Sequence, residues 1–146
     1  MSDKKTMKYV KSCGFVVFKQ TENENYYLII KSSNEDVGFP KGHMEKGETE
    51  LQTAIRELKE ETNVEIKVVD GFRRQIEYKI PKTVDTIKQC VYFLGICTKD
   101  EIICQAEEVT EAAFMPYEKA LSFLTFTETK DILTSAQEFI NKIKQF

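Results

Sequence analysis

Apolar and polar positions near the start of the chain follow a pattern that is typical of β-strands. Residues 9–19, YVKSCGFVVFK, are rich in β-branched and aromatic side chains, and YYLIIK at 26–31 follows the polar stretch QTENEN. These two apolar runs with a polar loop between them predict two strands. Residues 34–46 contain Gly, Pro and charges without periodicity, which indicates a structured loop.

A helix is predicted over residues 49–62. This segment lacks Gly and Pro, and Thr49 with Gln52 matches a capping box at its start. Asn63 can adopt the left-handed conformation that ends a helix. Apolar residues recur at the spacing of one helical face, and we expect this face to dock on a sheet: Leu51, Ala54, Ile55 and Leu58.

The rest of the chain continues with strands and ends with helices. Strand-like segments lie at 64–69, 72–80, 86–98, around 102–103 and at 112–115, and helical patterns cover 117–124 and 127–143. We expect an α/β fold, with a mixed, curved β-sheet sandwiched between α-helices. Residues 1–146 are expected to form a single domain, with 1–7 as a flexible N-terminal segment.

Composition narrows the class of protein further. With 41% hydrophobic and 31% charged residues the chain is typical of a globular protein, and it has no apolar run that suggests a membrane span or signal peptide. A net charge of −3 argues against a stable nucleic-acid partner. Four scattered cysteines without a CxxC pair are interpreted as buried, reduced thiols. We expect a cytoplasmic protein that acts as a monomer.

Three carboxylates within the predicted central helix suggest a metal site. Glu57, Glu60 and Glu61 stand at positions i, i+3 and i+4, so they share one helical face and repel one another. A divalent cation would turn this repulsion into attraction, and carboxylate oxygens suit Mg²⁺, with Mn²⁺ as a second option. The alternative is that the three glutamates are the solvated face of an amphipathic helix.

The residues around these glutamates favour the metal site. From Gly42 the sequence reads GHMEKGETELQTAIRELKEETNV, with fixed positions at Gly42, Glu48, the Arg56-Glu57-Leu58 run, Glu60-Glu61 and Val64. This segment resembles the Nudix box, the motif of a family of metal-dependent pyrophosphohydrolases. One fixed position differs: Asn63 stands where the family has its last glycine, and Asn is a mild replacement at a helix cap.

The resemblance implies a role for each residue of the motif. Glu60 and Glu61 would coordinate the metal, and Glu57 would be a ligand or the base that activates water. The Gly42 carbonyl would be a further ligand, and Arg56 would pair with Glu48 to hold the loop on the helix.

Members of this family often use one more glutamate from a loop beyond the box. The acidic pair in Ala106-Glu107-Glu108-Val109 is suitably placed after the central strands, and Glu108 is favoured over Glu107. Exposed loop charge is the alternative for either residue.

Features outside the box resemble asymmetrical diadenosine tetraphosphate hydrolases. They are the run Pro40-Lys41-Gly42-His43, the run Gly71-Phe72-Arg73-Arg74 followed by Tyr78, the run Pro81-Lys82-Thr83, and an aromatic residue, Phe126, before the last helix. The substrate would then be a dinucleoside polyphosphate, cleaved to ATP and AMP. Phosphate contacts are predicted for four residues: Lys41, His43, Arg73 and Lys82.

Tyr78 and Phe126 are candidates for stacking on a nucleobase, although each could instead belong to the hydrophobic core. The same box also occurs in diphosphoinositol polyphosphate phosphohydrolases and in messenger-RNA 5′-end pyrophosphohydrolases. A non-enzymatic nucleotide sensor is another alternative, but such proteins commonly lose box glutamates, and this chain keeps all three.

Overall fold

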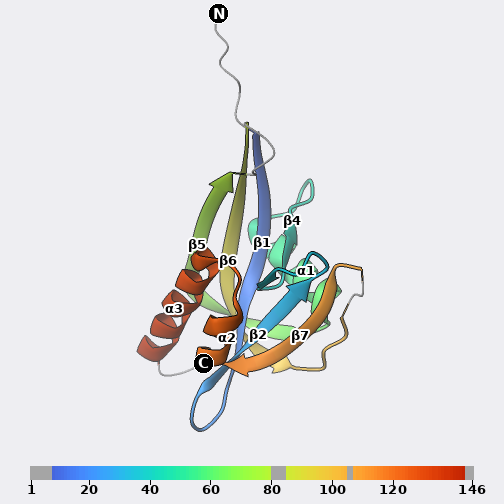
Figure 1. Ribbon diagram of the computed structural model, residues 1–146. Helices are drawn as coiled ribbons and strands as arrows, with labels where there is room; N and C mark the ends of the chain where they lie inside the picture. The colour runs from blue at the N-terminus through green and yellow to red at the C-terminus, as the bar shows by residue number, and fades with distance from the viewer. Residues whose placement is uncertain (1–7, 80–84, 105–106, 144–146) are drawn as a thin grey trace, which may run out of the picture.

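The computed structural model describes residues 8–79, 85–104 and 107–143. The expected flexible segment 1–7 lies outside the described residues. The strands are β1 Lys8–Gln20, β2 Asn25–Ser32, β3 Val37–Gly38, β4 Lys41–His43, β5 Glu65–Lys79, β6 Thr86–Lys99 and β7 Val109–Pro116. The helices are α1 Glu50–Thr62, α2 Tyr117–Phe123 and α3 Thr127–Lys142 (Figure 1).

The sheet is mixed, as the sequence predicts. Its strand order is β3-β2-β1-β6-β5, and β4 and β7 pair with β1 and β2 respectively. β1 and β6 pair in parallel from Lys8 opposite Thr86 to Phe18 opposite Ile96, whereas the other pairings are antiparallel. This parallel pair joins the N-terminal part of the chain to strands that come much later in the sequence.

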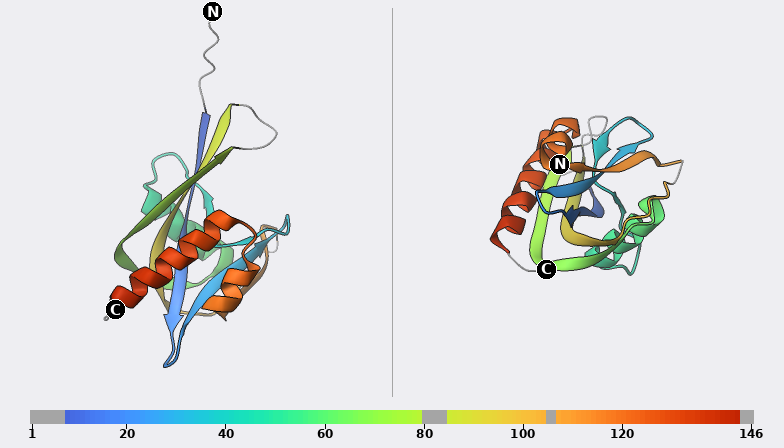
Figure 2. Two further views of the ribbon diagram at one scale, coloured as in Figure 1. Left: turned by 60° about the vertical axis from the view of Figure 1, so that its left-hand side comes forward. Right: turned by 90° about the horizontal axis from the view of Figure 1, so that it is seen from below.

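Helices cover both faces of the sheet, so the predicted α/β sandwich is confirmed (Figure 2). Successive side chains of β1 point to opposite faces. Cys13, Phe15 and Val17 pack in the core cluster that contains the α1 residues Ala54 and Leu58. Val16 and Phe18 belong to a second cluster that includes residues of α2 and α3. Each fully buried Val or Phe stabilises the fold by roughly 1.5–3 kcal/mol.

The predicted ends of α1 are confirmed. Thr49 accepts from the Gln52 backbone N–H at 3.1 Å, and the Gln52 side chain accepts from the Thr49 backbone N–H at 2.9 Å. Asn63 closes the helix in the left-handed region, with φ 66°. The helix therefore begins with side chain to backbone bonds between Thr49 and Gln52 and ends with a bond from the Asn63 backbone N–H to the Lys59 carbonyl, all of them local in sequence.

The docking face of α1 differs from the prediction at one residue. Ala54 and Leu58 are buried, but Ile55 is 45% exposed. The face that meets the sheet continues from these two residues to buried Glu61, and Ile55 lies about 100° around the helix from Ala54. The apolar pattern alone could not show that a glutamate takes part in the docking face.

Three strand predictions also need correction. The expected loop at 34–46 contains β3 and β4, because β4 pairs with β1. The predicted strands at 64–69 and 72–80 belong to one strand, β5, whose register shifts between Val69 and Arg73 near Gly71 at φ 95°. Residues 102–103 form no strand, since the Ile103 N–H donates to the Thr62 carbonyl at the end of α1.

The structure also shows the state of the cysteines and the length and polarity of the helices. None of the four cysteines, all of which lie in the described ranges, forms a disulfide; Cys13 and Cys90 are buried as expected, whereas Cys97 and Cys104 are half-buried. Within the described ranges, each helix is too short or too polar to cross a membrane.

Asn63→Ala is expected to lower the free energy of unfolding by about 1 kcal/mol, because alanine tolerates the left-handed conformation less well. Asn63→Gly should remain closer to wild type. Glycine has no Cβ penalty, although the contact from Asn63 Nδ2 to the Glu101 carbonyl at 3.1 Å would be lost. Urea unfolding of the three proteins checks this order, and an unchanged stability of Asn63→Ala would contradict it.

Candidate metal site and nucleotide cleft

Helix α1 carries the two glutamates at the centre of the candidate site. Glu57 and Glu61 are one turn apart, and both lie on the side of α1 that approaches β4. Glu61 is only 5% exposed. Glu60 lies toward solvent, and its carboxylate accepts from Arg56 Nη1 at 3.2 Å. Of the three box carboxylates, Glu57 and Glu61 thus form an inner pair, whereas Glu60 lies at the surface.

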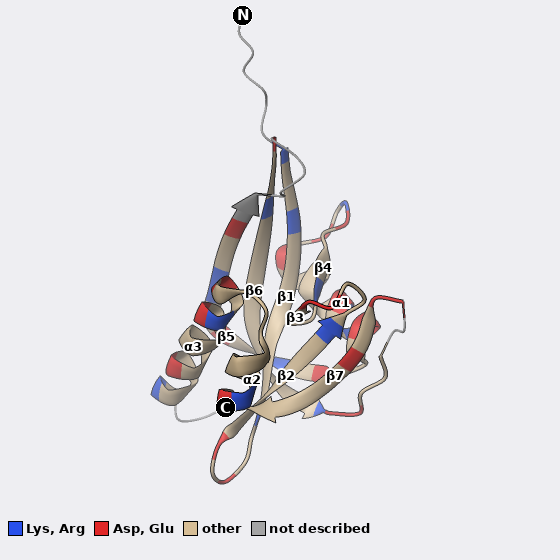
Figure 3. Ribbon diagram, viewed as in Figure 1, with Lys and Arg blue, Asp and Glu red and all other residues tan. Residues whose placement is uncertain are grey.

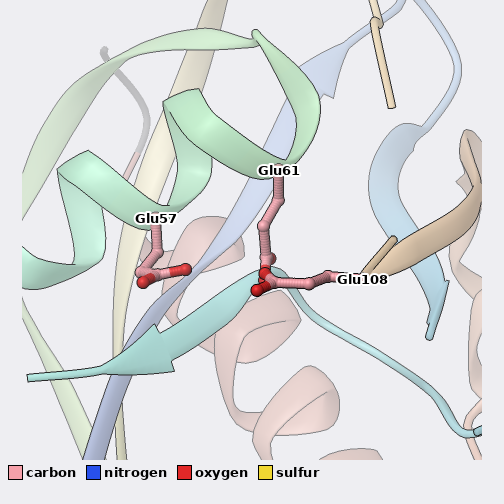
Figure 4. A group of neighbouring side chains, drawn as sticks. All are labelled: Glu57, Glu61 and Glu108. Carbon is pink, nitrogen blue, oxygen red and sulfur yellow. The ribbon is translucent and has the colours of Figure 1, made fainter. Parts of the chain in front are cut away.

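A third inner carboxylate comes from the loop before β7. Glu57, Glu61 and Glu108 each offer an oxygen, and these atoms all lie within 4.8 Å of one another (Figure 4). Acidic residues are concentrated where α1 approaches the start of β7 (Figure 3). Glu107 and Glu108 are both exposed, but among the described residues it is the Glu108 carboxylate that joins the two helix glutamates.

Burial and mutual repulsion change the proton affinity of the inner pair. Burial, followed by the charge of Glu57, raises the pKa of Glu61 to about 8, and Glu108 adds to this effect. The pKa of Glu57 is also raised, chiefly by burial. A divalent cation fits this group, because it would offset the repulsion and because carboxylate oxygens are its preferred ligands.

The backbone of β4 runs directly beside these carboxylates. A Cβ placed on Gly42 would lie 2.0 Å from Glu57 Cδ, so a side chain at this position would displace the Glu57 carboxylate from its place beside β4. The Lys41 backbone N–H donates to Glu61 Oε1 at 3.2 Å. Gly42 therefore leaves room for the Glu57 carboxylate beside β4. The main-chain N–H of Lys41 holds the Glu61 carboxylate.

Arg56 connects the loop after β4 with the glutamates. Its Nε and Nη2 donate to the two oxygens of Glu48 at 2.6 and 3.0 Å, which is the ion pair that the resemblance implied. Nη2 also donates to the His43 carbonyl at 3.0 Å, and Nη1 donates to Glu57 Oε2 at 2.8 Å. Arg56 thus holds both the loop and the Glu57 carboxylate in place.

A cleft of ≈ 610 Å³ opens beside the inner carboxylates. Glu61 and Glu108 lie in its wall together with the cations Lys41 and Lys88, and Phe126 contributes an aromatic ring that is 48% exposed. The remaining lining is mostly apolar or neutral but has two further acidic residues, and it consists of Ile30, Ser32, Asn34, Asp36, Val37, Gly38, Phe39, Ile76, Tyr92, Val109, Glu128 and Thr129. The cleft thus combines acidic, basic and aromatic groups.

Lys88 is a cleft residue that the sequence analysis missed. Burial, followed by the nearby charge of Lys41, lowers its pKa. The only sequence signal is a lysine in the mainly apolar strand β6, in the run TIKQCVYF, and this does not show which face of the sheet the lysine occupies.

The other residues predicted to contact the substrate are not among the described residues that line the cleft. His43 is exposed, and its pKa is lowered by partial burial and then by Lys88 and Lys41. The Arg73 guanidinium donates to both oxygens of Glu50 at 2.9 Å, and it is absent from the described lining of the cleft. Tyr78 lies on β5 opposite Lys88, but its side chain is outside the described part, as is Lys82.

Comparison with known proteins places these features in a family. The NUDIX domain family matches residues 9–136, so the chain belongs to the Nudix family of hydrolases. The asymmetrical bis(5′-nucleosyl)-tetraphosphatase of Mus musculus is 28% identical and covers 90% of this chain and 95% of its own. A crystal structure of a C. elegans Ap4A hydrolase binary complex has a TM-score of 0.83 at 24% identity, covering 92% of this chain and 99% of that one.

A further relative is named for a different kind of substrate, RNA. The RNA pyrophosphohydrolase of Nitratiruptor is 28% identical over 98 residues, which cover 60% of this chain and 63% of the relative.

Glu50→Gln is expected to remove part of the acid sensitivity of folding. Arg73 and Lys11 lower the Glu50 pKa from 4.5 to about 2. The stability that ionised Glu50 contributes is therefore complete above about pH 4.5 and is lost as the pH falls through about 2. With allowance for solvent screening, wild type should exceed Glu50→Gln by about 1–2 kcal/mol near pH 6. Urea unfolding from pH 2 to 6 measures this, and parallel pH profiles would contradict it.

Proposed function

We propose that this protein is a metal-dependent hydrolase that cleaves diadenosine tetraphosphate asymmetrically, giving ATP and AMP. The observation that carries the proposal is the Glu57, Glu61 and Glu108 group, of which Glu61 and Glu108 line a cleft with two lysines and an exposed aromatic ring. A dinucleoside polyphosphate offers matching chemistry, with an anionic bridge and flat bases. The similarity to a tetraphosphatase over most of both chains supports the same substrate class.

The three inner carboxylates are the proposed metal ligands, and Glu60 and the Gly42 carbonyl are proposed to add to them. Bound Mg²⁺ or Mn²⁺ would neutralise phosphate oxygens and lower the pKa of the attacking water. Arg56 holds Glu57 at its place beside β4, where its carboxylate serves as a ligand or accepts the proton of the water. The water oxygen bonds to phosphorus as the bond to the bridging oxygen breaks, so no covalent intermediate is needed.

The rest of the cleft is proposed to hold the substrate. The ammonium groups of Lys41 and Lys88 and the imidazole of His43 lie near enough to influence one another electrostatically, which suits a chain of phosphates. Phe126, with Tyr78 from β5, is proposed to stack on a base. We assign Arg73 a lesser part than the sequence suggested, because Glu50 already neutralises it. One chain supplies the whole set, so we propose that the protein acts as a monomer.

Hydrolysis at the 5′ end of RNA is a second candidate, supported by the similarity to the Nitratiruptor enzyme. The substrate would then be a 5′-triphosphorylated RNA. A sensor without hydrolytic activity is less consistent with a chain that has brought three carboxylates together.

Incubation with diadenosine tetraphosphate and Mg²⁺ should release ATP and AMP in equal amounts, and both should be resolved by ion-exchange chromatography. Without divalent metal, in the presence of EDTA, the products should be absent. Two molecules of ADP would contradict asymmetric cleavage. Preferential attack on 5′-triphosphorylated RNA in a parallel reaction would favour the second candidate.

Two substitutions on the same helix make this assay specific to the proposed site. Glu61→Gln should lower kcat about 10²- to 10⁴-fold, since it removes a charge that holds metal and water. Glu50→Gln, on the first turn of α1, should keep the wild-type rate at pH 7. Circular dichroism checks that both are folded, and equal activities of the two variants would reject Glu61 as a site residue.

Phe126→Ala is expected to raise KM for diadenosine tetraphosphate roughly 5- to 150-fold, which corresponds to the loss of about 1–3 kcal/mol of base stacking. Phe123→Ala is the matched control. Phe123 is 52% exposed, in the neighbouring helix α2, but it is not part of the described cleft. Steady-state kinetics of both variants tests the assignment, which fails if the two KM values change alike.

A further inference from the structure

A pair of hydrogen bonds ties the segment before α3 to strand β3. The Val37 N–H donates to Thr125 Oγ1 at 2.8 Å, and the Thr125 N–H donates to the Val37 carbonyl at 3.1 Å. The two residues are far apart in sequence, and Thr125 directly precedes Phe126. Main chain and side chain of Thr125 therefore both bind the same residue of β3.

Phe126 occupies a position at which another residue type would stabilise the helix better. It is the N-cap of α3, where Ser, Thr, Asp and Asn are preferred because their side chains accept from the free N–H groups. A phenyl ring cannot accept in this way, and the helix has no side-chain cap. The Phe126 carbonyl is fixed instead by Thr129 Oγ1 at 2.8 Å and by the Lys130 N–H at 3.2 Å.

The turn that leads into Val37 also bonds to the main chain of Glu108. The turn between β2 and β3 is closed by bonds from the Ser32 N–H to the Asp36 carbonyl at 2.9 Å and from the Glu35 N–H to the Ser32 carbonyl at 3.0 Å. In the same turn, the Ser33 N–H donates to the Glu108 carbonyl at 3.1 Å. One short turn is thus bonded at one end to Glu108 and at the other to Thr125.

We infer that Thr125 is a positioning residue, which holds Phe126 against the cleft at a fixed distance from Glu108 and thereby determines how well a nucleobase is bound. The inference rests on the stacking role of Phe126 in the proposed function. Thr125 acts through Phe126 and does not itself belong to the described lining of the cleft. Without the hydroxyl, Val37 and Thr125 keep one of their two bonds, so the fold should persist while the ring becomes less well placed.

The test compares a ligand that has a base with one that has none. ATP and inorganic tripolyphosphate, each with Mg²⁺, are titrated calorimetrically into wild type, Thr125→Val, Thr125→Ser and Ser122→Ala. Valine has the shape of threonine without the hydroxyl, and serine retains it. Ser122→Ala removes a comparable bond, from Ser122 Oγ to the Lys119 carbonyl at 2.7 Å, in the adjacent helix.

Thr125→Val should bind ATP about 3- to 10-fold more weakly than wild type and bind tripolyphosphate with unchanged affinity. Thr125→Ser and Ser122→Ala should resemble wild type with both ligands. Equal losses for both ligands, unchanged ATP binding by Thr125→Val, or a wild type that binds ATP no better than tripolyphosphate would overturn the inference. Because binding is measured, failure to cleave diadenosine tetraphosphate would reject the proposed function alone.

Discussion

Glu57, Glu61 and Glu108 bring charges of one sign into a space that is partly shielded from water, and the surrounding structure compensates for their repulsion. The contacts that do this come from different elements of the fold. The main chain of β4 donates to Glu61, Arg56 neutralises Glu57, and the turn after β2 holds the loop of Glu108. The arrangement of the acidic group therefore depends on the packing of α1 against β1 and β4 as a whole.

The parts of the site that could be predicted from sequence are those fixed by local contacts. Thr49 and Asn63 determine the ends of α1 through bonds to nearby backbone, so the helix could be located to within a residue. The spacing of Glu57 and Glu61 then follows from helical geometry. Arg56 and Glu48 are likewise near in sequence, and the motif was sufficient to pair them.

The remaining features depend on contacts between distant segments, which apolar periodicity does not encode. Glu108 is favoured over Glu107 from the sequence, but no local contact separates them; in the structure the Ser33 N–H donates to the Glu108 carbonyl, and the path of β7 places Glu108 at the site. Lys88 could be placed in the cleft only once the face of β6 was known. The resemblance predicted that Arg73 contacts phosphate, and the sequence could not show that Arg73 pairs with Glu50 on another element. The residues that bear on substrate choice belong largely to this second group.

The parallel pairing of β1 with β6 has a consequence for how the chain is synthesised. The strand that anchors the fold leaves the ribosome early, but its partner along most of its length follows only after α1 and β5 have been made. Until then, one edge of β1 and its apolar side chains lack their cover, and such edges are prone to associate with other chains. A nascent chain that ends after the Gly42–Val64 segment thus contains the whole motif without the framework that holds it, and it would need protection by chaperones.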